Sequence, residues 1–179
     1  MSNAVITAHP RHKRRWSETL KSFWLDIVLF FAFIVDMNTR FTGIAIHEWL
    51  GIGIGIALFY HLMLHWKWIV AITKRIFSKL PAAHRIRYLV DILLFVDMVV
   101  LIVTGLWISE VAMQQIGLLP QRSRFFSVLH RLTADWSIWL VGLHLALSWD
   151  WIVINFKKYI LRPIASVTRR QAKQARGQA

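Results

Sequence analysis

Four long apolar stretches account for most of the chain and limit what it can fold into. Each is long enough for a helix to cross the ~30 Å hydrocarbon layer of a membrane, which takes roughly 17 to 25 residues. The sequence therefore predicts four membrane-spanning helices, at 22–38, 43–73, 86–110 and 134–156. The second stretch is longer than a span needs, so its helix is expected to continue beyond the membrane.

The composition agrees with a membrane protein that has basic ends. Hydrophobic residues make up 56% of the 179 residues and charged residues only 17%, against about a quarter in a typical soluble domain. The net charge is nevertheless +13. The hydrophobicity argues against a disordered basic chain, and the apolar stretches leave little polar surface for nucleic acid. We expect an all-α integral membrane protein that contacts membrane lipid and binds no nucleic acid.

The cations indicate how the helices are oriented. Most of the 22 Lys and Arg residues lie in the N-terminal tail, in the linker after the second span or in the C-terminal tail, and only four lie elsewhere. Because cytoplasmic segments are enriched in Lys and Arg, both termini are predicted to be cytoplasmic. The expected architecture is a multi-pass, up-down-up-down four-helix bundle at 22–156, between basic cytoplasmic tails at 1–21 and 157–179.

An internal repeat relates the second span to the fourth. Two histidines, two tryptophans, two leucines and an isoleucine of 47–69 recur at the corresponding positions of 130–152, with no gap between the two copies. The first and third spans also match, with Asp26 and Asp91 at equivalent positions. The chain is therefore predicted to contain two duplicated helical hairpins.

The repeat carries two pairs of histidines with the same spacing. His47 and His61 lie in the second span, and His130 and His144 lie equally far apart in the fourth. In a helix this spacing of about four turns leaves the two side chains within about 40° of one face and about 21 Å apart. Because the second and fourth spans run parallel in the predicted bundle, His47 is expected to oppose His130 on the outer side, and His61 to oppose His144 on the inner side.

Opposed histidines are suited to binding haem iron. Each pair offers two neutral imidazole nitrogens to one metal ion, so the pattern predicts one outer and one inner haem. The chain has no cysteine, which excludes covalent attachment through Cys-x-x-Cys-His. The expected cofactors are thus two non-covalent b-type haems. The alternative is that unrelated histidines hydrogen-bond between helices.

Further residues are candidates for supporting these haems. Gly51 and Gly55 share a helix face between the histidines of the second span, where their missing side chains leave room for a porphyrin or a neighbouring helix. Asp26 and Asp91 can accept a hydrogen bond from a ligand imidazole, cap a helix, or exchange protons with a quinone. Cations on the outer side are candidates for pairing with haem propionates; they are Arg40, Arg122, Arg124 and Arg131.

The stretch around the first histidine resembles a known family. The residues Thr42-Gly43-Ile44-Ala45-Ile46-His47-Glu48-Trp49-Leu50-Gly51, followed by His61-Leu62-Met63-Leu64-His65, are similar to the flavinylation-associated cytochromes. The two histidine pairs are more distantly similar to the cytochrome b of quinol-oxidising complexes. The resemblance covers about 26–158 and implies a b-type cytochrome that passes electrons across a membrane. It also implies redox partner subunits, including a flavin-carrying extracytoplasmic protein.

One histidine departs from the repeat. Ser148 stands where the second copy would match His65. His65 follows His47 by about five whole helical turns, which puts it close to the face of His47. It is therefore a reserve ligand should His61 not bind iron.

Three functional classes remain open. The first is an electron-transfer subunit of a redox system in the bacterial cytoplasmic membrane. The second is an oxidoreductase with its own quinol or quinone site beside one haem. The third is a haem-free membrane scaffold or ion carrier. No Ser-His-Asp or Cys-His arrangement of a hydrolytic enzyme stands out in the sequence, so we expect an electron-transfer subunit rather than a stand-alone enzyme.

Overall fold

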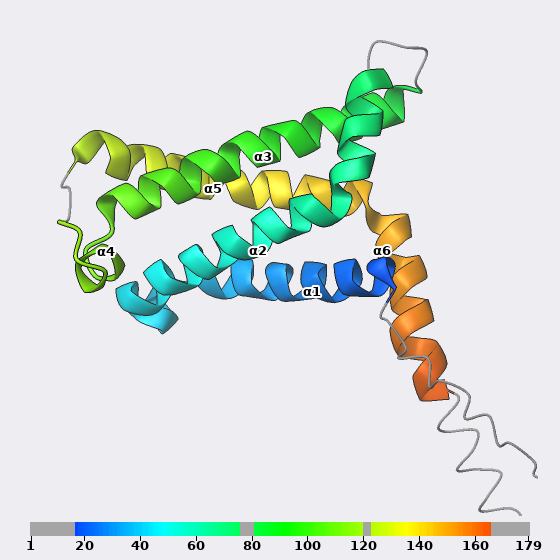
Figure 1. The fold of residues 1–179 in the computed structure, drawn as a ribbon, viewed down its shortest axis with the longest axis horizontal. Helices are drawn as coiled ribbons and strands as arrows, with labels where there is room; N and C mark the ends of the chain where they lie inside the picture. The colour runs from blue at the N-terminus through cyan, green and yellow to red at the C-terminus, as the bar shows by residue number, and fades with distance from the viewer. Residues whose placement is uncertain (1–16, 76–80, 120–122, 166–179) are drawn as a thin grey trace, which may run out of the picture.

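The computed structural model describes residues 17–75, 81–119 and 123–165, and every regular element within these ranges is helical (Figure 1). Four helices are long: α1 (Glu18–Asp36), α2 (Thr39–Arg75), α3 (Ala82–Ile108) and α5 (Arg124–Leu147). Three elements are short: α4 (Ala112–Gln115), α6 (Trp149–Phe156) and η1 (Lys157–Leu161), the last a π-helical stretch. The predicted all-α class is confirmed for the described residues.

The bounds of the predicted tails stay predictions. Most of 1–21 and the end of 157–179 lie outside the described residues, as does Arg122. Helix α1 begins at Glu18, inside the expected first tail, and η1 lies inside the expected second tail.

Local sequence signals set the ends and the direction of the long helices. The Ser17 hydroxyl accepts a hydrogen bond from the backbone N–H of Leu20 at the start of α1, at 3.3 Å. Ser123 does the same for Phe126 at the start of α5, at 3.4 Å, and serine is a favoured residue at this position. Near its start, α2 is kinked at Gly43, whose φ of +74° is a conformation that glycine adopts readily. The long straight part of α2 therefore begins just before His47.

The long helices pack as two hairpins. Helix α1 packs mainly on α2, and α3 packs mainly on α5, while α2 contacts α3 between the two pairs. The start of α1 and the segment α6 lie at the same end of the molecule (Figure 1), where the ring of Phe23 contacts those of Trp151 and Tyr159. This arrangement agrees with the two hairpin copies inferred from the repeat.

Two of the described helices, α2 and α3, are long and apolar enough to cross a membrane. A third span results if α5 and the following segment are counted together, although they meet at a bend of 65°. Helix α1 is not among these candidates, because its 19 residues include four charged ones, Glu18, Lys21, Asp26 and Asp36. The structure thus has two or three candidate spans, and the four-span bundle and its orientation stay predictions.

The expected bounds of the fourth span, 134–156, are wrong. Helix α5 begins at Arg124 and ends at Leu147, and the chain then bends into α6. The guanidinium of Arg87 on α3 donates a hydrogen bond to the carbonyl oxygen of Leu147, and the Ser148 N–H bonds back to the His144 and Leu145 carbonyls. These contacts occupy groups at the end of α5, which accounts for the break.

Few apolar side chains are buried within the described residues. Much of the apolar surface of the long helices is exposed, as expected where helices face lipid rather than water. Small polar residues are buried between α3 and α5, notably Thr104, Thr133 and Ser137, and small residues let membrane helices approach closely. The buried apolar residues are Phe23, Ile54, Val90, Met98, Leu101 and Ala112.

Candidate functional site

His47 on α2 and His130 on α5 face one another across the two hairpins. Their ring centroids are 6.1 Å apart and their planes are inclined by 75°. Imidazole nitrogens bind a transition-metal ion at about 2 Å, so a metal ion shared by two facing rings sets their centroids roughly 6 Å apart. The separation of this pair therefore has the size that a shared metal ion requires.

Backbone carbonyls fix the orientation of both rings. His47 Nδ1 lies 3.0 Å from the carbonyl oxygen of Asp36, and His130 Nδ1 lies 2.9 Å from that of Leu101. A carbonyl can only accept, so both Nδ1 atoms carry the proton and donate. Within the described residues, neither Nε2 takes part in a hydrogen bond. Each ring thus keeps one unprotonated nitrogen for a ligand.

The second pair uses carboxylates for the same purpose. His61 Nδ1 lies 2.8 Å from an oxygen of Asp26 on α1, and His144 Nδ1 lies 2.7 Å from an oxygen of Asp91 on α3. Of the roles that the sequence left open for these aspartates, the structure shows the hydrogen bond to an imidazole. Such a bond fixes the tautomer of a metal-binding histidine and raises its basicity.

The acceptors follow the internal repeat. Asp91 stands at the same position in the second hairpin as Asp26 in the first, and Leu101 stands at the same position as Asp36. These last two residues supply the two carbonyls. The two hairpins therefore repeat a complete hydrogen-bonding pattern, in which the first helix of each hairpin orients both histidines of the second.

The structure does not bring His61 and His144 into ring contact. Within the described chain, the ring of His61 instead contacts that of His65, with centroids 4.7 Å apart. His65 Nε2 is 2.8 Å from the hydroxyl of Ser22. One ligand atom from each of Asp26, His61 and His65 lies within 4.8 Å of the others, so the reserve ligand is beside this second site.

Glycines lie against both aspartate and histidine side chains. A Cβ on Gly51 would be 3.8 Å from Asp36 Oδ2, and one on Gly55 would be 3.5 Å from Ile102; both are ordinary helix-packing distances. Gly105 is different, because a Cβ there would be 2.8 Å from Cε1 of His130. The ring of His130 thus lies directly on the α3 backbone. The sequence did not single out Gly105: the pair Thr104-Gly105 resembles Thr42-Gly43, but Gly43 lies at the kink of α2 and Gly105 lies within α3.

The predicted propionate partners lie at the surface. Arg40 near the start of α2, Arg124 at the start of α5 and Arg131 beside His130 are all exposed. Among the described residues, neither Arg40 nor Arg124 has an ion-pair partner. Both guanidinium groups therefore stay candidates for an anionic group.

The two residues after His47 attach α2 to the connection between α3 and α5. The Glu48 carboxylate accepts hydrogen bonds of 2.7–2.9 Å from the Ser109 hydroxyl and from the backbone N–H groups of three residues that open α4, Glu110, Val111 and Ala112. Trp49 Nε1 donates to the side-chain oxygen of Gln115 at 2.8 Å. The motif His47-Glu48-Trp49 thus combines one candidate ligand with two anchoring contacts, which the sequence could not reveal because α4 is only four residues long.

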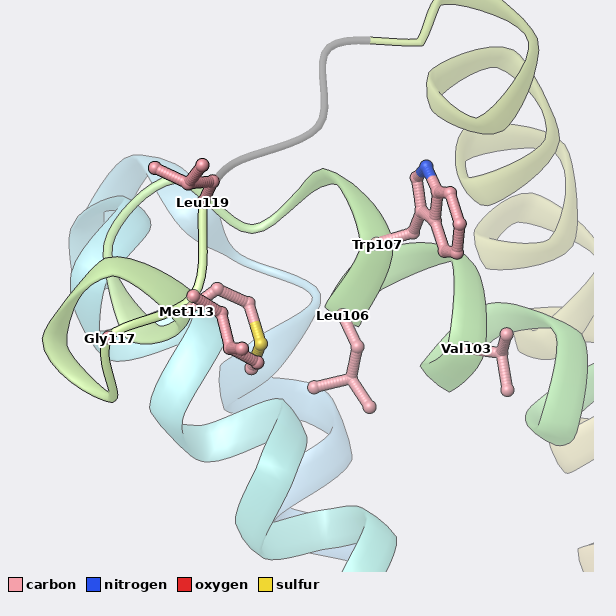
Figure 2. A pocket seen from close by; sticks show the side chains of 7 residues that line it. Val103, Leu106, Trp107, Met113, Gly117 and Leu119 are labelled. Atoms are coloured by element: carbon pink, nitrogen blue, oxygen red, sulfur yellow. The ribbon is translucent and has the colours of Figure 1, made fainter.

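An open apolar pocket of about 650 Å³ adjoins the end of α3 that carries Gly105. In Figure 2, Val103, Leu106 and Trp107 of α3 line one side, and Met113 and the chain after α4 line the other. The full lining is Val103, Leu106, Trp107, Met113, Gly117, Leu118 and Leu119. Its lining is apolar, but Leu118 and Leu119 are largely exposed, so it is an open hollow rather than an enclosed cavity.

A comparison with protein families decides the class of the chain. The family model for prokaryotic cytochrome b561 matches residues 7–150, which include all four paired histidines. The chain belongs to the prokaryotic cytochrome b561 family. It is therefore a membrane cytochrome of the b type, a class of haem-binding electron-transfer protein. No curated protein and no solved structure matches the chain.

The residues of this cytochrome fit a haem group. The His47–His130 spacing suits a shared iron, each of the four histidines donates through Nδ1, and Gly105 leaves the room that the His130 ring fills. Neutral imidazole is the usual nitrogen ligand of haem iron in proteins. Membership of the family and the donor set of this structure thus agree.

Proposed function

We propose that this cytochrome b561 family member is a di-haem, electron-transfer subunit of a redox system in the bacterial cytoplasmic membrane. His47 and His130 are proposed to hold an outer haem, and His61 and His144 to hold an inner haem. The observation that carries the proposal is the facing His47–His130 pair, with a centroid separation of 6.1 Å.

Bound haem supplies a one-electron couple, and the chain supplies the ligands, their orientation and the local polarity. In this proposal His47 and His130 each present Nε2 to the iron, while the carbonyls of Asp36 and Leu101 hold the rings by Nδ1. Asp26 and Asp91 hold the rings of the second pair. Arg40 and Arg124 are proposed to pair with propionates, and Gly51 and Gly55 to border the porphyrin.

The proposed orientation makes the protein a path for electrons through the bilayer. His47 and His61 are separated along α2 by about four helical turns, or about 21 Å, which is most of the hydrocarbon layer. In this proposal α1 is the remaining span, and the concentration of Lys and Arg in the tails and in the linker after α2 supports cytoplasmic termini. The similarity around His47-Glu48-Trp49 to the flavinylation-associated cytochromes favours a flavin-carrying extracytoplasmic protein as the redox partner.

Single histidine variants test the ligand assignment. His47→Ala or His130→Ala is expected to lower the haem content of the purified protein from two per polypeptide to one, and so are His61→Ala and His144→Ala. The double variant His47→Ala/His61→Ala should hold none. His84, which is exposed at the start of α3, provides the control, because His84→Ala should keep two haems. An unchanged content of two in all four single variants would contradict the assignment.

A second candidate function is quinol or quinone oxidoreductase activity, and the apolar pocket favours it. This pocket begins at Val103, close in the chain to Gly105, which the His130 ring contacts. Val103, Leu106 and Trp107 project from the side of α3 opposite Leu101, Thr104 and Gly105, so α3 would separate a quinone ring held there from the His130 ring. Addition of a short-chain quinol to the purified protein alone tests this function. Rapid haem reduction that is slowed by Leu106→Trp supports a quinone site in the pocket, and no reduction by quinol argues for electron delivery by a partner.

A further inference from the structure

The two histidine pairs differ in the groups that accept their Nδ1 protons. Both acceptors of the His61–His144 pair are side-chain carboxylates, at 2.8 and 2.7 Å. Both hydrogen-bond acceptors of the His47–His130 pair are neutral backbone carbonyls, at 3.0 and 2.9 Å. Positions 26 and 91 are equivalent in the repeat, and both are aspartate. Positions 36 and 101 are also equivalent, but the first is aspartate and the second is leucine.

A carboxylate changes an imidazole more than a carbonyl does. Its full negative charge draws the Nδ1 proton toward the acceptor, which raises the basicity of Nε2. A more basic axial ligand stabilises the ferric state relative to the ferrous state and so lowers the reduction potential of a bound haem. The low dielectric constant around buried membrane groups strengthens this effect.

Carboxylates also lie near the His47–His130 pair, but they do not accept its Nδ1 hydrogen bonds. Asp36 does place a carboxylate oxygen 3.2 Å from His47 Nδ1, but His130 has only neutral oxygens near its Nδ1, from Leu101 and Thr104. The His47–His130 pair thus has two nearby carboxylates, Asp36 and Glu48, and neither accepts a direct hydrogen bond from a ring nitrogen. The Glu48 carboxylate is instead hydrogen-bonded to Ser109 and to three backbone N–H groups. The His61–His144 pair has two carboxylates, each bonded directly.

We propose that Asp26 and Asp91 are positioning residues that make the haem bound by His61 and His144 the low-potential haem of the two. This inference rests on the proposed function, because it requires both haems. Electrons then reside preferentially at the His47–His130 site, the site that the proposed orientation places on the outer side.

Redox potentiometry followed by visible absorption tests the order without altering either aspartate. The full-length protein should show two components of different potential. His61→Ala should retain only the higher component, and His47→Ala only the lower. The opposite assignment of the components overturns this inference while leaving the di-haem function intact, whereas a protein with fewer than two haems contradicts the proposed function itself.

Substitution of Asp91 tests the cause. Asp91→Asn keeps a hydrogen-bond acceptor but removes its charge, so it should raise the lower potential and leave the higher one unchanged. Asp91→Glu should restore a low potential because it restores the carboxylate. The exposed Asp150 on α6 gives a matched control, and Asp150→Asn should move neither component. An Asp91→Asn protein with two haems and unshifted potentials overturns the inference. If Asp91→Asn fails to bind the second haem, Asp26→Asn and Asp91→Glu are compared instead, and equal potentials in these two proteins overturn it.

Discussion

At the scale of single residues, the site depends on which nitrogen of each histidine is used. All four paired histidines donate through Nδ1, two to carboxylates and two to backbone carbonyls. This leaves Nε2 as the nitrogen for a ligand, on the side of each ring away from the helix that orients it. The identities and spacing of the histidines were predictable from the sequence. The carbonyl acceptors were not, because every residue has a carbonyl and only the packing of α3 against α5 selects that of Leu101.

The contact between Gly105 and His130 leads to a prediction at this scale. Gly105→Ala puts a Cβ 2.8 Å from Cε1 of a ring that is already held by Leu101. The ring has to shift, so the purified variant is expected to lose most of one haem and keep the other, as measured by haem content per polypeptide. Gly142→Ala is the control, because a Cβ there meets nothing within 4 Å. Equal haem contents in the two variants would show that the contact does not matter for binding.

At the scale of the elements, Glu48 is the main link between α2 and the connection from α3 to α5. Its carboxylate satisfies N–H groups that open α4, where the first turn of a helix lacks internal partners. Hydrogen bonds to a charged group contribute about 1.5–3 kcal/mol each to stability. Glu48 is therefore expected to have a structural role that is separate from the ligand role of its neighbour His47.

Glu48→Gln tests this role. Glutamine offers one acceptor oxygen in place of two and carries no charge, so the free energy of unfolding should fall by about 2–4 kcal/mol. The measurement is thermal unfolding of the detergent-solubilised protein, followed by circular dichroism. Glu18→Gln removes an exposed carboxylate that pairs with Lys21 at the surface, and it should have a much smaller effect. Similar losses in both variants would contradict a special role for Glu48.

Apolar periodicity predicted the long helices but not how they end. The break at Ser148 was missed because Trp149, Trp151 and Ile152 continue the hydrophobic run, while the contact that terminates α5 comes from Arg87 on another helix. The short helix α4 was missed because its hydrogen bonds depend on Glu48, which precedes it by most of two long helices. Composition along the chain cannot reveal partners that are distant in the sequence. The two-hairpin arrangement was predictable because each copy of the internal repeat contains the sequence pattern of one helical hairpin.

At the scale of the whole molecule, the proposed function depends on how the two hairpins sit in the membrane. The start of α1 and the segment α6 lie at one end, and α4 lies at the other (Figure 1). The positive-inside rule assigns the first end to the cytoplasm. This orientation would place the His61–His144 site nearer the cytoplasm and the apolar pocket nearer the outside.

Cysteine labelling tests the orientation without background, since the chain contains no cysteine. Gln114→Cys on α4 and Ala165→Cys after η1 both replace exposed residues. A membrane-impermeant thiol reagent added to spheroplasts should label Gln114→Cys at once and Ala165→Cys only after the membrane is permeabilised. The reverse pattern would invert the proposed direction of the molecule.

The proposed function requires that the two histidine pairs hold two haems. The most direct measurement is the haem content per polypeptide of the purified full-length protein, together with its reduced-minus-oxidised absorption spectrum. Two haems per polypeptide with a b-type spectrum are expected. A single haem would contradict the second site, and a protein without a b-type spectrum would contradict the proposed function as a whole.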